Sequence, residues 1–437
     1  MAIHIWKSNL RLILHTVSII SLFMIMLVCN HLAIKAQLTN EPVRLGIDNL
    51  IEMNFSPLSG KKVALLTNTS GRTYDLKTTA SVFAESNECT IVSILAPEHG
   101  YFATIPAGLE VANDSLYGVP VYSLYGKFRR PTKSMLEACD IVVVDIQDIG
   151  IRSYTYISTL YNVMDACAEY GKDILVLDRP NPLGGMIVDG ATADQNLLSF
   201  VGIVPIPYVH GLTIGEFALL VNGEGMLPKD NKGIPRKPNL QILKMKNWKR
   251  SMVWEETGLH FVPTSPNIPS VHAVRGAAVT GPIGELGSAG IGIGTTFPFQ
   301  YLASPDINAD TLLQLCNENL MQLGVHAGIG RYKIATGKYP NRECYGLILF
   351  MNGAPEDKPY SAGVELLLGL RTLLPQQFTP EYVKDEPKSM FRKIMSNDAL
   401  VDALLKGKTD DEVRNELTKG RKEFMDIRKQ YLLYSEY

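Results

Sequence analysis

The stretch 141–152, IVVVDIQDIGIR, decides the fold class of this chain. Four consecutive β-branched apolar residues run directly into Asp145, Gln147, Asp148 and Arg152. A continuous apolar run of this length is typical of a strand that is buried on both faces of a parallel sheet. Polar residues that follow such a strand lie at the carboxyl edge of the sheet, where open α/β sheets bind ligands. The stretch therefore predicts an α/β fold with polar groups gathered at one sheet edge.

Other apolar runs alternate with amphipathic stretches, which indicates βαβ units and a parallel sheet. We expect further strands over 63–67, 91–95, 174–177 and 206–209, and helices over 156–170 and 214–222, the second capped by Thr213. The residues at the ends of the five strands are Asn68, Glu98, Asp145, Asp178 and His210. Each has a local explanation, because such side chains often bond turn backbone. Five together favour a shared site over coincidence.

The rest of the chain is more irregular. We expect a surface loop over 229–238, a strand followed by a helix within 240–254, a proline-fixed wall over 261–269 and a glycine-rich loop over 281–296. That loop is not a dinucleotide fingerprint, because it does not open the first βα unit. Beyond it the pattern becomes α+β, with a helix over 310–323, a strand over 344–349, a helix over 361–373 and amphipathic helices to the end. We expect an N-terminal domain over 40–268 and a smaller C-terminal domain over 269–437.

Residues 1–36 have the features of a secretory signal peptide. Two basic residues precede the apolar stretch 12–28, and the small residues that follow predict cleavage after Ala36. We therefore expect the protein to be secreted or periplasmic. The alternative is an uncleaved membrane anchor, since the apolar stretch is long. Lipidation at Cys29 is less favoured, because Val28 stands where a lipoprotein signal has a small residue.

Composition excludes several classes of protein. Of 437 residues, 46% are hydrophobic and 20% charged, which is typical of a globular chain rather than a disordered or fibrous one. No basic run accompanies the net charge of −2, so no nucleic-acid partner is expected. The cysteines after the signal are scattered and lack CxxC spacing, which indicates buried small side chains with at most one bridge. They are Cys89, Cys139, Cys167, Cys316 and Cys344.

Glu98, which is followed by His99 and Gly100, is the strongest candidate for a general acid. The alternative is that its carboxylate only organises the loop through backbone N–H groups. Asp145 and Asp148 add two carboxylates, and glycoside hydrolysis needs two such groups at one bond.

Two arginines and two tyrosines have alternative roles at the same sheet edge. Arg152 and Arg179 suit a clamp on a substrate carboxylate, or a simple pairing with Asp148 or Asp178. Tyr154 and Tyr156 suit a stacking platform or, equally, the core.

Metal and serine chemistry are less favoured. His99, His210, Glu98 and Asp145 would suit zinc or manganese, but no HExxH-like spacing supports a metal site. No GxSxG elbow supports a serine hydrolase. We therefore expect neither a metal nor a cofactor, and a metal-dependent hydrolase remains a rival hypothesis.

With these residues in view, the sequence resembles the family of exo-acting β-N-acetylmuramidases, long known only as a bacterial domain of unknown function. The matching stretches follow the family's order across nearly the whole mature chain: LLTNTSG (65–71), PEHG (97–100), PVYSLYG (120–126), DIQDIGIRSYTYISTL (145–160), VLDRPNPLGG (176–185), HGLTIGE (210–216), TSPN (264–267) and YLLY (431–434).

The resemblance implies a Rossmann-like N-terminal domain, a smaller α+β domain and an active site in the cleft between them. The implied reaction releases N-acetylmuramic acid from the non-reducing end of peptidoglycan fragments, acting on MurNAc-GlcNAc saccharides or muropeptides during cell-wall recycling. Its implied catalytic acid is Glu98, with Asp145, Asp148 and His99 as further candidates. The sugar's acetamido group is an alternative nucleophile, which an aspartate would only orient. The implied binding positions are Asn68, Gln147, Arg152, Tyr154, Asp178, Arg179, Asn181, His210, Glu216, Asn267 and Glu285.

One departure from the family concerns specificity. The family commonly has an EGTN…GRGT pattern, where this chain keeps Glu285 but has Ile293 in place of the arginine. If that arginine reads the sugar's lactyl carboxylate, the preferred substrate shifts toward another hexosamine or a peptide-bearing muramyl unit. A periplasmic binding protein without catalysis is the rival from another class.

Overall fold

The computed structural model describes residues 21, 23, 24, 26, 41–335, 337–383 and 390–436. The predicted cleavage site and Cys29 lie outside these residues. The described residues from Arg44 onward form one compact unit, to which the following description applies. No helix among the described residues is both long enough and apolar enough to cross a bilayer.

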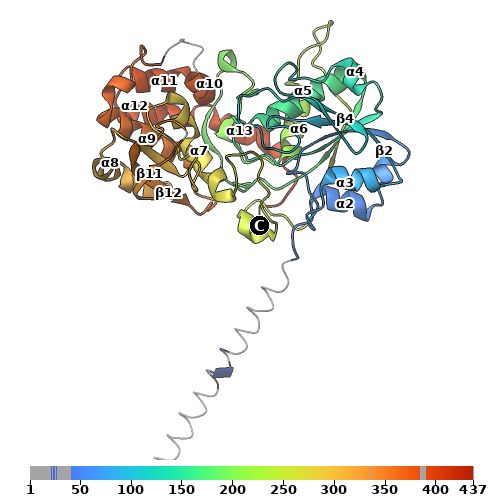
Figure 1. Cartoon of the computed structure of the whole chain (residues 1–437), viewed down its shortest axis with the longest axis horizontal. Helices are drawn as coiled ribbons and strands as arrows, with labels where there is room; N and C mark the ends of the chain where they lie inside the picture. The colour runs from blue at the N-terminus through green and yellow to red at the C-terminus, as the bar shows by residue number, and fades with distance from the viewer. Residues whose placement is uncertain are drawn as a thin grey trace, which may run out of the picture. The chain divides into compact units, whose positions relative to one another are not determined.

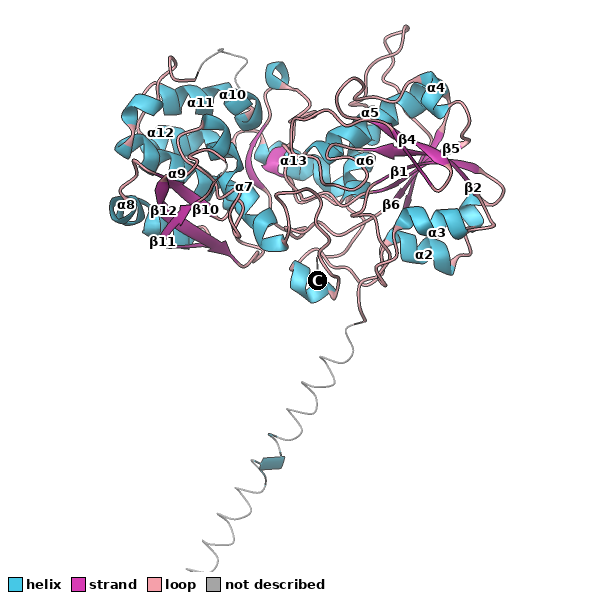
Figure 2. Cartoon of the chain, in the orientation of Figure 1, coloured by secondary structure: helices cyan, strands magenta, loops and turns pink. Residues whose placement is uncertain are grey.

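A seven-stranded sheet organises the first half of this unit (Figures 1 and 2). Its strands are β1 (Lys62–Thr67), β2 (Thr90–Ala96), β3 (Asp114–Leu116), β4 (Val119–Ser123), β5 (Ile141–Asp145), β6 (Asp173–Leu177) and β9 (Leu240–Leu243). They lie in the order β3-β4-β2-β1-β5-β6-β9, and only the edge strand β3 runs antiparallel to its neighbour. The six parallel strands thus follow the Rossmann order 3-2-1-4-5-6, whose switch point lies between β1 and β5.

The central strands are buried on both faces, as the opening stretch predicts. Val142 and Val144 of β5 pack in one core with α5 (Thr155–Tyr170) and α6 (Ile214–Gly223). Val143, from the opposite face, packs in a second core with α2 (Gly46–Glu52) and α3 (Thr79–Glu85). Figure 1 shows α5 and α6 on one side of the sheet and α2 and α3 on the other, with α4 (Lys133–Leu136) beside α5.

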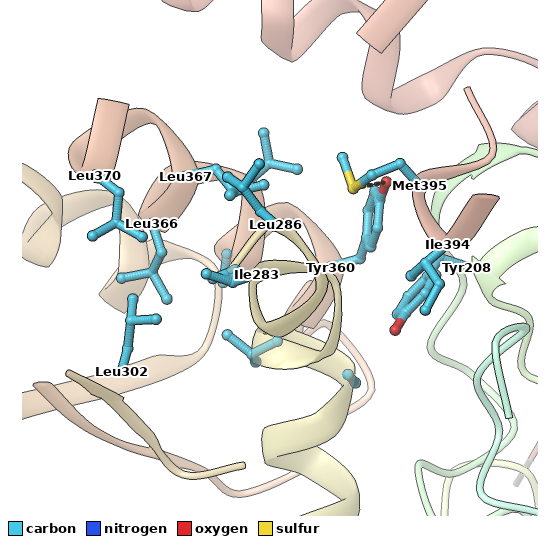
Figure 3. Close-up of a cluster of buried hydrophobic side chains, with 14 of the residues drawn as sticks. Tyr208, Ile283, Leu286, Leu302, Tyr360, Leu366, Leu367, Leu370, Ile394 and Met395 are labelled. Carbon is cyan, nitrogen blue, oxygen red and sulfur yellow. Dashed lines mark hydrogen bonds between the residues drawn. The ribbon is translucent and has the colours of Figure 1, made fainter. Parts of the chain in front are cut away.

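The second half combines helices with a three-stranded antiparallel sheet in the order β10-β12-β11. The strands are β10 (Tyr301–Ser304), β11 (Val325–Lys333) and β12 (Glu343–Met351). The helices are α7 (Val271–Leu286), α8 (Ala309–Gln322), α9 (Pro359–Leu373), α10 (Met390–Met395), α11 (Asp398–Leu405), α12 (Asp410–Asn415) and α13 (Arg421–Arg428). Figure 3 shows Ile283 and Leu286 of α7 packed among leucines of α9, in the same core as Tyr208 and Ile394.

A small ribbon and several short helices complete the fold. Strands β7 (Asp189–Thr192) and β8 (Pro207–Val209) pair antiparallel, outside the large sheet. The 3-10 helices are η1 (Ser56–Leu58), η2 (Gln195–Leu197), η3 (Trp254–Thr257), η4 (Pro375–Gln377), η5 (Glu416–Thr418) and η6 (Lys429–Tyr431).

The C-terminal segment returns to the Rossmann-like sheet. Phe424 of α13 packs in the core formed by α5 and α6. Beyond it, the Tyr434 hydroxyl donates to Asp178 Oδ2 at 2.6 Å, and the Leu433 N–H donates to Glu216 Oε1 at 2.9 Å. The domain limits drawn from the sequence stay a prediction.

Three expectations about local structure are wrong. The run 206–209 does form a strand, but β8 pairs with β7 instead of joining the parallel sheet, because a short apolar run does not specify its partner. The expected helix within 240–254 is absent; β9 is followed by irregular backbone and then η3. The glycine-rich loop begins only at Gly287, because α7 continues to Leu286 despite Pro282 inside it.

The cysteines occupy the interior, as predicted. All five described cysteines are buried and none of these five is bridged to another.

Candidate active site

A pocket of about 460 Å³ receives side chains from both halves of the chain. Glu98 and His99 reach it from the loop after β2, and Tyr154 from the residue before α5. Asn267 reaches it from the proline-fixed segment, and Glu285 from the last turn of α7. A volume of this size is in the range of small-molecule sites. The structure therefore brings five of the predicted site residues to one hollow.

Glu98 is held firmly in the wall of this pocket. Its side chain is buried, Oε2 accepts a hydrogen bond from Thr155 Oγ1 at 2.6 Å, and Oε1 accepts one from the Gly108 N–H at 3.2 Å. Tyr125 lies beside it, and burial together with the Glu98 carboxylate raises the pKa of the Tyr125 hydroxyl. A carboxyl that is oriented by two hydrogen bonds at a pocket wall meets the geometric requirement for a general acid.

The loop after β2 is shaped around His99. This residue has a φ of 70°, in the left-handed region that non-glycine residues rarely occupy. Its Nδ1 lies 2.7 Å from the Ile105 carbonyl oxygen, which fixes the ring against its own loop. The imidazole thus lines the pocket while the strained turn directs Glu98 into it.

Glu285 is the second carboxylate that lines the pocket. Part of the Glu285 side chain is exposed to solvent at the pocket surface. Its carboxyl group is partly buried, and this burial raises the pKa of Glu285. The Tyr154 hydroxyl donates to Thr264 Oγ1 at 2.8 Å, and burial raises the Tyr154 pKa, so this phenol stays protonated. Tyr156, the other predicted platform, is fully buried and belongs to the core.

Asp145 lies behind the pocket, at the switch point of the sheet. Arg179 donates to its Oδ1 from Nε at 2.5 Å and to its Oδ2 from Nη2 at 3.0 Å, and the Thr79 hydroxyl donates to Oδ2 as well. The carboxylate is buried. Arg179 therefore pairs with Asp145, and the expected pairing with Asp148 or Asp178 is wrong. Both side chains brace the ends of β1 and β5.

Five other predicted site residues are buried and hydrogen-bonded to their own surroundings: Asn68, Gln147, Asp178, Asn181 and Glu216. Glu216 is an example, since its Oε2 accepts from the Thr213 N–H at 3.0 Å in a capping box and its Oε1 from Arg250 Nη1 at 2.6 Å. None of the five is among the residues that line the 460 Å³ pocket. They shape the loops that carry the pocket residues.

Arg152 has a different place from the predicted clamp. Its side chain is fully buried, and its guanidinium donates to four backbone carbonyls. Nη1 reaches Ala191 O at 3.3 Å and Ile206 O at 2.7 Å. Nη2 reaches Ile394 O at 3.1 Å and Met395 O at 3.0 Å. Arg152 pairs with neither aspartate; it ties α10 to the β7–β8 ribbon.

Asp148 and His210 form a buried pair beside the pocket. His210 Nε2 lies 3.9 Å from Asp148 Oδ2. Within the described residues, His210 Nε2 and Asp148 Oδ1 have no hydrogen-bond partner. Burial raises the pKa of Asp148 to about 7 and lowers that of His210 to about 3.

The structure also adds residues that the sequence analysis did not single out. Thr155 and Tyr125 contact Glu98 directly. Both lie in stretches that match the family, 145–160 and 120–126, and this match is the sequence signal that could have identified them. Arg129 and Lys393 line the pocket as well. No sequence pattern predicts that these two residues line the pocket, because Arg129 lies in a loop and Lys393 in α10, far apart in the chain.

The described residues contain no group of three or more histidine, cysteine, aspartate or glutamate side chains placed to hold a metal ion. A second, smaller cavity, of about 20 Å³, touches Gln147 and Arg179. That volume holds about one water molecule, so it cannot accept a sugar.

Comparison with known proteins agrees with this architecture. Two family models match, described as the N-terminal and C-terminal parts of the exo-beta-N-acetylmuramidase NamZ, over residues 63–272 and 280–434. The peptidoglycan beta-N-acetylmuramidase NamZ of Bacillus subtilis (strain 168) is 35% identical over 403 residues, covering 92% of this chain and 94% of that protein.

Two crystal structures of DUF1343 family proteins from Bacteroides fragilis NCTC 9343 are similar in fold. One has a TM-score of 0.81 at 35% identity, covering 90% of this chain and 99% of that one. The other has a TM-score of 0.70 at 29% identity, covering 91% of this chain and 100% of that one. With both family models matched in order along its length, the chain belongs to the exo-β-N-acetylmuramidase NamZ family.

Proposed function

We propose that this protein is an exo-acting glycosidase that releases N-acetylmuramic acid from the non-reducing end of peptidoglycan fragments, with Glu98 as the catalytic acid. The membership in the NamZ family supports the reaction class. The observation that carries the assignment of the acid is the position of Glu98, oriented by Thr155 and Gly108 in the wall of the 460 Å³ pocket.

In this mechanism Glu98 protonates the glycosidic oxygen as the bond to the leaving sugar breaks. Glu285 is the companion carboxylate, because it lines the same pocket whereas Asp145 and Asp148 do not. Two roles suit Glu285: it activates the attacking water, or it orients the acetamido group of the sugar for attack. The configuration of the first-formed product separates them, since attack by water inverts the anomeric carbon and acetamido participation retains it.

The site acts outside the cytoplasm in this proposal, as the basic and apolar N-terminal sequence favours. The substrates are MurNAc-GlcNAc saccharides or muropeptides from cell-wall turnover.

The test uses the purified protein with a chromogenic β-N-acetylmuramide and the matching N-acetylglucosaminide. Wild type is expected to release the chromophore from the muramide, and Glu98→Gln to lose about 10²–10⁴-fold in kcat with little change in KM. Glu137→Gln is the matched control, because Glu137 is an exposed carboxylate beside α4. Its activity should equal that of wild type.

Two outcomes would favour the rival functions. A wild-type protein that binds the muramide without turning it over is a binding protein. Turnover that a chelator abolishes and zinc or manganese restores belongs to a metal-dependent hydrolase.

A further inference from the structure

N-acetylmuramic acid differs from N-acetylglucosamine by a lactyl ether on O3, which ends in a carboxylate. A pocket that selects the muramyl sugar gains most from a cation that meets this carboxylate. Arg129 and Lys393 are the arginine and the lysine among the described residues that line the pocket. Ile293, at the position where the family commonly has an arginine, presents an apolar side chain to the same pocket.

Arg129 is held by aromatic stacking rather than by an acid. Its guanidinium carbon lies 4.6 Å from the ring centroid of Phe200 and 5.3 Å from that of Tyr125. No hydrogen bond or ion pair of its guanidinium occurs within the part of the chain that the structure describes. Stacking orders the planar group and leaves its N–H edges available.

Arg130, the next residue, is paired with carboxylates instead. Arg130 donates from Nε to Asp165 Oδ2 at 2.5 Å and also pairs with Glu169, so its charge is already matched. The two successive arginines therefore differ in what their guanidinium groups contact. One is engaged by carboxylates of α5, and the other lines the pocket with its hydrogen-bonding capacity unused.

Arg129 is also well placed relative to the acid. Tyr125 contacts both groups: it lies against the Glu98 carboxylate, and its ring supports the Arg129 guanidinium. One tyrosine ring therefore separates the proton donor from the cation. In a muramyl sugar, the lactyl group on C3 lies about one sugar-ring width from the anomeric carbon that Glu98 serves.

We infer that Arg129 binds the lactyl carboxylate of the substrate and so determines the preference for muramyl over glucosaminyl sugars. This inference rests on the proposed function. Lys393 is the weaker candidate, because an ammonium on a flexible chain lacks the planar fork that pairs with both carboxylate oxygens.

The test compares two substrates: the chromogenic muramide with a free lactyl carboxylate, and the same muramide with that carboxyl converted to an amide. Wild type should prefer the acid. Arg129→Gln should lower kcat/KM for the acid about 10- to 100-fold, mainly through KM, and change the amide less than about 3-fold. Arg129→Lys should recover part of the loss, and Lys393→Gln should keep the wild-type ratio.

An equal loss on both substrates in Arg129→Gln would overturn the inference, as would a collapse of the ratio in Lys393→Gln alone. If wild type hydrolyses neither substrate, the proposed function fails, and calorimetry then tests Arg129 by itself. Wild type should bind N-acetylmuramic acid more tightly than N-acetylglucosamine, and Arg129→Gln should abolish that difference. A difference that survives in the variant counts against Arg129.

Discussion

His210 Nε2 and Asp148 Oδ2 face each other across 3.9 Å in the interior of the protein. The Leu212 N–H donates to His210 Nδ1 at 3.1 Å, so the proton of the neutral ring sits on Nε2, toward Asp148. Burial opposes charge on both groups, which raises the pKa of Asp148 to about 7 and lowers that of His210 to about 3. In mildly acidic solution the His210 imidazole is therefore neutral and the neighbouring Asp148 carboxyl is protonated.

This pair makes opposite contributions to the pH dependence of stability. Asp148 binds its proton more tightly when folded, so its contribution is fully present below about pH 4 and is lost as the pH rises to about 7. His210 binds its proton less tightly when folded, so its contribution is present above about pH 6.5 and is lost as the pH falls toward 3. Between about pH 4 and 6.5 the two slopes offset each other.

Asp148→Asn should therefore gain stability relative to wild type as the pH rises from 4 to 7, by about 2–4 kcal/mol in total. Above pH 7 the difference should be constant. Urea unfolding of both proteins at intervals of one pH unit measures this difference in the free energy of unfolding. A difference that does not change between pH 4 and 7 would mean that Asp148 is ionised throughout.

Arg152→Met should destabilise the protein by about 3 kcal/mol or more, because four buried carbonyls lose their donor. Thermal or urea unfolding measures the loss. Arg129→Met is the matched control, since that arginine lines the pocket and should change stability by less than about 0.5 kcal/mol while altering kinetics. The reverse result, normal stability with a raised KM in Arg152→Met, would restore the substrate clamp predicted from the sequence.

Thr155→Val should lower kcat about 10-fold with KM nearly unchanged, because Glu98 Oε2 loses the hydroxyl that orients it. Thr155→Ser should keep most of the activity. The matched control is Thr159→Val, one turn further along α5, whose hydroxyl donates to the Thr155 carbonyl at 3.0 Å. Steady-state kinetics on the muramide separate these variants, and equal losses in Thr155→Val and Thr159→Val would point to a general effect on α5.

Gly150→Ala should cost about 2–4 kcal/mol and disturb the neighbouring Asp148. Gly150 has a φ of 82°, and an added Cβ would lie 2.2 Å from Asn181 Oδ1. Gly171→Ala is the control, because its φ of 66° is similar but a Cβ there meets nothing within 4 Å. That change should cost only about 1 kcal/mol, the backbone strain alone. Equal losses at the two positions in denaturant unfolding would show that the clash is relieved.

The Rossmann-like sheet could be predicted because local signals agree with the tertiary structure. Four β-branched residues in succession favour a strand that is covered on both sides, and Val142 and Val143 do belong to different cores. The position of β8 could not be predicted, because three apolar residues carry no information about their partner. Helix α7 was missed because its glycines serve close packing: a Cβ at Gly281 would lie 2.9 Å from the Tyr208 hydroxyl oxygen.

The site was only partly predictable for a related reason. Strand ends mark the sheet edge, and Glu98 was found there. The same rule also selected Asp145 and Asp178, whose oxygens satisfy buried backbone and side-chain donors. Whether a polar side chain enters the pocket or braces the loop behind it depends on partners distant in sequence. Arg179, Thr213 and Tyr434 are such partners.

The contacts of Tyr434 and Leu433 with Asp178 and Glu216 link the C-terminal segment to the Rossmann-like sheet. Both carboxylates also accept hydrogen bonds from Thr213, and Tyr434 and Leu433 add donors that lie 256 and 217 residues further along the chain than Asp178 and Glu216. Contacts of such long sequence separation close a large loop of chain, which costs conformational entropy. We therefore expect the Rossmann-like sheet and the segment around Tyr434 to unfold as one cooperative unit, although they lie far apart in the sequence.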